Sequence, residues 1–336
     1  MRGKALLWRG GGLLLICLLL FGLELLCGNG AIDSPAELQA VGMQKILWQI
    51  RLPRALAAAG CGALLSVAGL LMQTLFRNPL ASPSILGIST GASIGVAFIV
   101  LVLGGGTWGT VALSLHLGWV IVAALAGAAV VLLLLLAFSG YLTDNNTLLL
   151  MGVMLGYLGS ALISLWQYLS RPEQLQAFFV WMMGSFDGLL LEHVPWFLAG
   201  SLLLLCAPWL TARQLNLLLM GEDYARSMGV SLRFMRRWII FWAAFATALA
   251  TTFCGPIGFV GIAVPHLTRL LLHRQNHLLT IPFAWLMGAA FCMACDLLAR
   301  LFDTYYTLPV NVVTSLIGAP LVLSIFWRRR KQMLAT

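Results

Sequence analysis

Long apolar runs separated by short polar connections fill the sequence. A helix needs about 20 apolar residues to cross the hydrocarbon core of a bilayer. Ten runs approach or exceed that length, at 6–27, 54–76, 84–104, 114–138, 147–169, 193–211, 237–254, 257–272, 279–300 and 309–327. The eighth is the shortest and contains Pro265. Because backbone groups in lipid must be satisfied within the protein, the pattern predicts an all-α, polytopic membrane protein with about ten transmembrane helices.

The first run follows Met-Arg-Gly-Lys and looks like a secretory signal peptide. Its apolar stretch exceeds the usual signal-peptide core of about 7–15 residues, and apolar runs continue along the chain. We interpret it as a retained first helix, and residues 1–336 as a single transmembrane domain. Small residues at helix-packing spacing, such as Gly60, Gly62, Ser66 and Gly69, predict tight contacts between helices.

Composition supports the membrane assignment. Hydrophobic residues make up 61% of the chain and charged residues 9%, against about 45–50% and 25% in soluble domains. All seven cysteines lie in or beside apolar runs, so we interpret them as packing residues and not as a disulfide framework.

The net charge of +9 is explained by topology. If the N-terminus is cytoplasmic, ten spans place fifteen of the twenty Lys and Arg residues on the cytoplasmic side and eight of the eleven acidic residues outside. This distribution follows the positive-inside rule. The lipid bilayer therefore accounts for the basic balance, and no nucleic-acid partner is needed.

A connection at about 212–236 lies on the cytoplasmic side in this topology. Its polar stretch from Glu222 to Ser227, between Gly221 and Gly229, is too short and too polar to span a membrane. A solvated loop would fit the pattern. A short surface helix that presents Glu222, Arg226 and Met228 to a partner would fit it equally well.

Several motifs resemble those of one permease family. They are Gly-Glu-x-x-Ala-x-x-x-Gly from Gly221 to Gly229, Arg-Leu-Pro-Arg at 51–54, and the segments 69–92, 181–186, 258–269, 296–300 and 308–320. In this order, from about residue 46 to 328, they are similar to the permeases of ATP-binding-cassette importers for ferric siderophores, haem and cobalamin. The resemblance implies a cobalamin-permease-like bundle in a bacterial inner membrane, with both termini cytoplasmic.

The resemblance also implies partners. Gly221, Glu222, Ala225, Arg226 and Gly229 match a coupling helix that docks into an ATPase subunit. Two ATPase subunits, a second permease copy or a paralogue, and a periplasmic or lipid-anchored binding protein would complete the importer. ATP would be bound by the ATPase subunits, since this sequence has no G-x-x-x-x-G-K-[ST] motif. We expect no cofactor on this chain.

Five further residues match functional positions of the family. Arg51, Arg54 and Arg300 are basic residues on the outer side. They are either interfacial arginines that reach the headgroups or a rim that receives carboxylates of the binding protein, and the resemblance favours the rim. Leu80 and Asn145 match positions that narrow the cytoplasmic end of the pathway.

Other sites are disfavoured. His273 and His277 stand four residues apart but lack a third metal ligand nearby in the sequence, and Asp296 is explained by an i, i+4 ion pair with Arg300. A transporter driven by an ion gradient needs ionisable residues within its spans, and here such residues cluster at helix ends. An intramembrane enzyme of the zincin type would show an H-E-x-x-H motif, and none occurs. The sequence leaves the cargo open among siderophore, haem and cobalamin.

Overall fold

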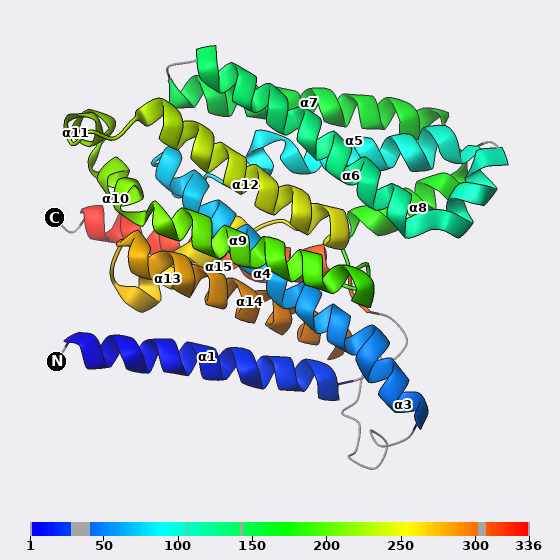
Figure 1. Ribbon diagram of the computed structural model, residues 1–336, viewed down its shortest axis with the longest axis horizontal. Coiled ribbons are helices and arrows are strands. Elements are labelled where there is room, and N and C mark those ends of the chain that lie inside the picture. The colour runs from blue at the N-terminus through cyan, green and yellow to red at the C-terminus, as the bar shows by residue number, and fades with distance from the viewer. Residues whose placement is uncertain (1, 28–40, 106, 142–143, 302–306, 335–336) are drawn as a thin grey trace.

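A computed structural model describes residues 2–27, 41–105, 107–141, 144–301 and 307–334. Within these ranges the chain forms helices joined by turns (Figure 1). The α-helices are α1 (Arg2–Leu26), α3 (Val41–Ile46), α4 (Leu52–Leu75), α5 (Ile88–Ala97), α6 (Thr107–Tyr141), α7 (Asn145–Leu169), α8 (Pro172–Met182), α9 (Val194–Leu210), α10 (Ala212–Met220), α11 (Glu222–Ser227), α12 (Leu232–Cys254), α13 (Val260–Leu272), α14 (His277–Leu301) and α15 (Val310–Leu334).

The prediction of an all-α bundle with about ten spans is confirmed. Seven described helical segments are long and apolar enough to cross a membrane: Leu6–Leu26, Gln44–Leu75, Gly118–Tyr141, Asn145–Leu169, Leu191–Leu210, Leu232–Cys254 and His277–Leu301. Three shorter apolar segments, Ile88–Val102, Val260–Leu272 and Val310–Ser324, correspond to the remaining predicted runs. Helices α3 and α8 lie in connections where no span is predicted.

Helix α4 forms the centre of the bundle and packs against α9, α12, α13 and α14. From Gly60 to Leu75 every residue of α4 is buried. Glycines permit this packing, because a Cβ atom added to Gly62 would collide with the carbonyl of Gly288 on α14, and one added to Gly69 would collide with that of Gly261 on α13. Small residues let helix backbones approach closely. Such close packing stabilises transmembrane helix pairs, because the hydrophobic effect does not drive helix association within lipid.

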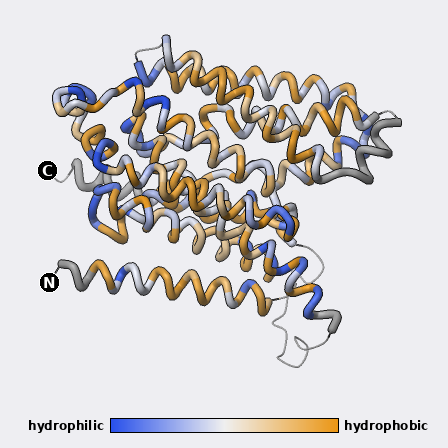
Figure 2. The backbone as a smooth tube through the Cα atoms, in the orientation of Figure 1, coloured by the Kyte–Doolittle hydropathy of each residue, from blue (hydrophilic) through white to orange (hydrophobic). Residues whose placement is uncertain are grey.

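Helix α1 lies at the edge of the bundle and packs mainly along α14 (Figure 1). Its outward residues are apolar, including Leu15, Leu18 and Leu19, which are 58–61% exposed. Helices α6 and α7 are likewise coloured largely as hydrophobic (Figure 2), and they carry exposed apolar residues such as Leu133 and Leu158. These surfaces suit lipid contact, so the protein is a multi-pass membrane protein.

The start of α1, the end of α15 and the short helices α10 and α11 lie at one end of the bundle (Figure 1). Several arginines lie at this end of the bundle. Arg77 follows the end of α4, and the others belong to helices that begin or lie there: Arg213 in α10, Arg226 in α11, and Arg236 and Arg237 in α12. We call this end the basic end. Helices α3 and α8 lie at the opposite end.

Candidate functional site

Helix α11 is a separate short helix at the basic end. Gly221 adopts φ 132° and ψ 149°, a conformation that side chains disfavour, and this breaks the chain direction between α10 and α11. At the other end Gly229 has φ +83°, its N–H bonds the carbonyl of Arg226, and the N–H of Val230 bonds that of Ala225. This pair of bonds is a Schellman cap, which terminates a helix. The two glycines therefore set both limits of α11.

The two sides of α11 differ in exposure. Ala225 is fully buried, whereas Asp223, Tyr224, Arg226 and Met228 are exposed. The segment is therefore a short surface helix and not a solvated loop. Arg226 and Met228 face outward as predicted, but Glu222 is half-buried and turned towards the bundle.

Glu222 connects α11 to two transmembrane helices. The Nδ2 atom of Asn145, the first residue of α7, donates a hydrogen bond of 2.6 Å to Glu222 Oε1. The same nitrogen donates to the carbonyl of Leu75, the last residue of α4, at 3.2 Å. A hydrogen bond to a charged acceptor is stronger than one between neutral groups. One amide thus links α11 to the ends of α4 and α7.

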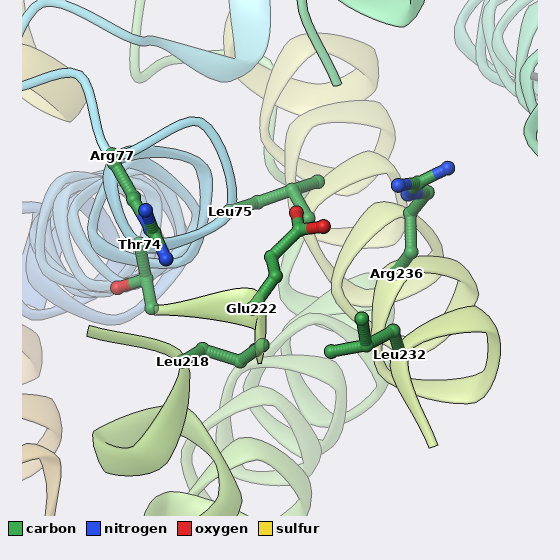
Figure 3. Close-up of a pocket in the computed structure, with 7 residues that line it drawn as sticks. All are labelled: Thr74, Leu75, Arg77, Leu218, Glu222, Leu232 and Arg236. Atoms are coloured by element: carbon green, nitrogen blue, oxygen red, sulfur yellow. The ribbon is translucent and has the colours of Figure 1, made fainter. Parts of the chain in front are cut away.

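The surroundings of Glu222 are basic. In Figure 3 its carboxylate points into the space between Leu75 of α4 and Arg236 of α12. Arg236 is buried, with 7% of its surface exposed. Nearby Asp144 caps α7 by accepting a 3.0 Å bond from the N–H of Thr147. That bond is the main reason why the pKa of Asp144 lies below its usual value, and the positive charge of Arg236 adds to the effect.

Buried polar contacts next to this site were not predicted. Gln73 on α4 accepts a 2.6 Å bond from Arg269 on α13 and donates to the carbonyl of Gly261. His277, at the start of α14, contacts Thr74 Oγ1 and Asn216 Oδ1, each at 2.8 Å. The position of Gln73 and Thr74 as polar residues inside an apolar run indicates that each needs a hydrogen-bond partner. The sequence does not identify these partners, because they lie 188–203 residues away along the chain.

His277 is buried whereas His273 is exposed, so their spacing does not bring them to one site. Within the described residues, no group of three or more His, Cys, Asp or Glu side chains is placed to hold a metal ion.

Leu80 lies in the turn that follows α4. Its N–H bonds the side chain of Asn78 at 2.9 Å, and its own side chain is 42% exposed. Asn145, the other residue predicted to narrow the pathway, is bonded to Leu75 and Glu222 instead of standing free. The role of both residues at a constriction stays a prediction.

At the opposite end, two of the three predicted docking arginines, Arg54 and Arg300, belong to a charge cluster. Arg54 on α4 contacts fully buried Asp296 on α14 through Nε and Nη2, at 3.0 and 2.9 Å. Its Nη1 contacts half-exposed Asp187 at 2.7 Å. Arg300 pairs with Asp296 at 3.0 Å, as the i, i+4 spacing predicts, and also with Glu24 of α1.

Exposure differs among the three arginines. The Arg300 side chain is 3% exposed and that of Arg54 is 11% exposed. Arg51 is part-buried, and it donates to the carbonyl of Leu25 at 3.0 Å. A carboxylate from another protein would have to displace Glu24 or Asp296 to pair with Arg300, whereas Arg54 and Arg51 lie closer to the surface.

The sequence profile of the FecCD transport family matches residues 13–328. The vitamin B12 import system permease protein BtuC of Klebsiella pneumoniae is 36% identical over 320 residues, which cover 95% of this chain and 93% of that protein. The protein of the same name from Escherichia coli is 35% identical over 326 residues, covering 95% and 94%. That from Serratia proteamaculans is 37% identical over 296 residues, covering 88% and 85%.

Two solved structures share the fold. One, described as an inward-facing conformation of a metal-chelate type ABC transporter, superposes with a TM-score of 0.84 at 30% identity and covers 94% of this chain and 98% of its own. PsaBC from Streptococcus pneumoniae, solved with a Fab, superposes with a TM-score of 0.52 at 15% identity, covering 85% and 93%. The second likeness concerns the fold alone.

Proposed function

Because this chain belongs to the FecCD transport family, we propose that it is the permease of an ATP-binding-cassette importer whose cargo is cobalamin or a metal chelate of similar bulk. Permeases that match it over nine-tenths of their length import vitamin B12, which favours a corrinoid over a ferric siderophore or haem. Each of those cargoes is large, and capturing it would be the task of a separate binding protein.

Energy would enter through α11 at the basic end, which we place in the cytoplasm because cytoplasmic connections are rich in Arg and Lys. The exposed side chains of Tyr224, Arg226 and Met228 would contact an ATPase subunit. The observation that carries this proposal is the bond between Asn145 and Glu222. Through it, movement of α11 would reach the ends of α4 and α7 directly.

The binding protein would dock at the opposite end, on the surface around Arg51 and Arg54. The support is chemical, because a guanidinium recognises carboxylates with defined geometry. Arg54 already holds Asp187, whose side chain is 50% exposed, so an incoming carboxylate would exchange with it. Arg300 would act indirectly, by holding Asp296 in place for Arg54.

A second permease would complete the pathway along α7. Tyr157, Ser160, Ser164 and Tyr168 are exposed on this helix at intervals that place them on one face. Hydroxyls on a surface within the membrane favour contact with protein or water over lipid. We therefore propose that two copies, or this chain and a paralogue, enclose the cargo between such faces.

Uptake into proteoliposomes tests the assignment. The chain is reconstituted with its ATPase and binding protein and offered cobalamin, a ferric siderophore or haem on the binding-protein side, with ATP on the other side. We expect ATP-dependent uptake of cobalamin, and none when the ATPase subunit is omitted. Uptake driven by an ion gradient without the ATPase would overturn the importer assignment, and ATP-dependent uptake of a different chelate would overturn only the cargo.

A further inference from the structure

A groove between α6 and α12 at the basic end has no part in the function proposed above. It is an open surface groove of about 560 Å³, lined by Leu136, Ala137, Phe234, Arg237, Trp238 and Phe241. The two helices pack side by side along this region (Figure 1). The lining is apolar except for a single guanidinium, that of Arg237.

Arg237 lies across the last turn of α6. A Cβ atom added to Gly140 would come within 2.8 Å of Arg237 Nη2, so the glycine leaves room for the guanidinium. The Arg237 side chain is exposed, and within the described part of the chain it has no hydrogen-bond or ion-pair partner. Asp144, which begins the connection into α7, is influenced by the charge of Arg236. Arg237 therefore presents an uncompensated positive charge at the mouth of an apolar groove.

The aromatic wall of the groove is held in place from behind. The rings of Phe234 and Trp238 stack with centroids 5.7 Å apart, and Trp238 meets Trp242 edge to face at 5.6 Å. The indole N–H of Trp238 donates to Thr211 Oγ1 at 3.2 Å. Phe234 and Phe241 remain 55% and 39% exposed. The wall is thus fixed on its inner side and open on its outer side.

We propose that this groove binds an anionic phospholipid, with the phosphate on Arg237 and an acyl chain along Phe234, Phe241 and Leu136. The ligand matches the site because it joins a negative group to an apolar chain at the depth where α12 enters the membrane. Basic pockets between transmembrane helices bind anionic headgroups in this way. Arg233, exposed one turn earlier on α12, adds positive charge. Assignment to the inner leaflet rests on the orientation proposed above.

Native mass spectrometry of the purified full chain tests this site without ATPase or cargo, so it fails or succeeds independently of the importer assignment. The chain is titrated with phosphatidylglycerol or phosphatidylcholine. We expect preferential binding of one phosphatidylglycerol. Arg237→Gln should weaken that binding about fivefold, the effect typical of one basic residue at an anionic membrane surface, and weaken phosphatidylcholine binding less, because its choline already neutralises the charge of the phosphate.

Arg274→Gln is the matched control, because Arg274 is exposed in the connection between α13 and α14 at the same end and does not line the groove. It should leave phosphatidylglycerol binding unchanged. Phe241→Ser should weaken both lipids, because it removes the surface for the acyl chain. Equal effects of the two arginine substitutions, equal binding of the two lipids, or displacement of the lipid by millimolar glycerol phosphate would overturn the proposal.

Discussion

The charge cluster at the end opposite α11 places three ionised side chains where little water reaches them. Asp296 is fully buried, Glu24 is 1% exposed and Arg300 is 3% exposed. An ion in such a place is tolerated only when it is paired, because desolvation costs several kcal/mol. Arg300 satisfies this condition for both acids and thereby joins the ends of α1 and α14.

Replacing Arg300 by methionine should destabilise the protein strongly, because it leaves Glu24 buried without a cation. Removal of one partner of a buried pair costs about 3–5 kcal/mol. The control is Asp187→Asn, which removes a half-exposed partner of Arg54 and should cost less than about 1 kcal/mol. Thermal unfolding in detergent measures both. Equal losses would show that burial of the cluster is not what stabilises this end.

Single residues also mark the limit of prediction from the sequence. The Asp296–Arg300 pair was predictable because both lie on one helix. The contacts of Arg54 with Asp296 and of Asn145 with Glu222 join residues 242 and 77 positions apart. Their geometry depends on which helices become neighbours, and spacing along the chain carries no information about that. For the same reason the sequence predicts that Glu222 faces a partner, whereas its carboxylate is turned towards the bundle.

At the scale of helices, α4 is held by contacts between small residues. Gly62 meets Gly288 backbone to backbone, and Ser66 donates a 2.6 Å bond to the carbonyl of Ala284 on α14. The glycine and serine pattern predicted such a face on this helix. It did not identify α14 as the partner, because several other spans carry similar small residues. Helix α8 was not predicted, since 172–182 is too short to span.

Gly62→Leu should abolish folding or leave the protein aggregated, because the added side chain would separate α4 from α14. Gly22→Leu on α1 is the matched control, since no neighbouring helix among the described residues comes within 4 Å of a Cβ placed there, and it should leave the yield of monodisperse protein near wild type. Size-exclusion chromatography after solubilisation compares the two. A monodisperse, stable Gly62→Leu variant would contradict the close contact between these helices.

For the whole molecule, the exposed hydroxyl-bearing face of α7 should meet water inside the assembled importer. Among the seven cysteines Cys206 is exposed, so the test uses a Cys206→Ser background. In it, Ser160→Cys should react several-fold faster with a water-soluble thiol reagent than Leu203→Cys. Leu203 is a 54% exposed apolar residue on α9 that should face lipid. Equal, slow labelling of both positions would place α7 against lipid and remove the support for a pathway there.

The proposed coupling of ATP hydrolysis to import depends on a mechanical connection from α11 to the membrane helices through Glu222 and Asn145. The most direct measurement is the number of cargo molecules imported per ATP hydrolysed, compared among wild type, Glu222→Ala, Asn145→Ala and the double variant. Asp223→Ala, which alters an exposed neighbour on the same helix, is the control. We expect each single variant to assemble with the ATPase but to import severalfold less cargo per ATP. The double variant should be no worse than either single variant, and the control should be unchanged. A wild-type ratio in the Glu222 and Asn145 variants, or losses that simply add in the double variant, would contradict it.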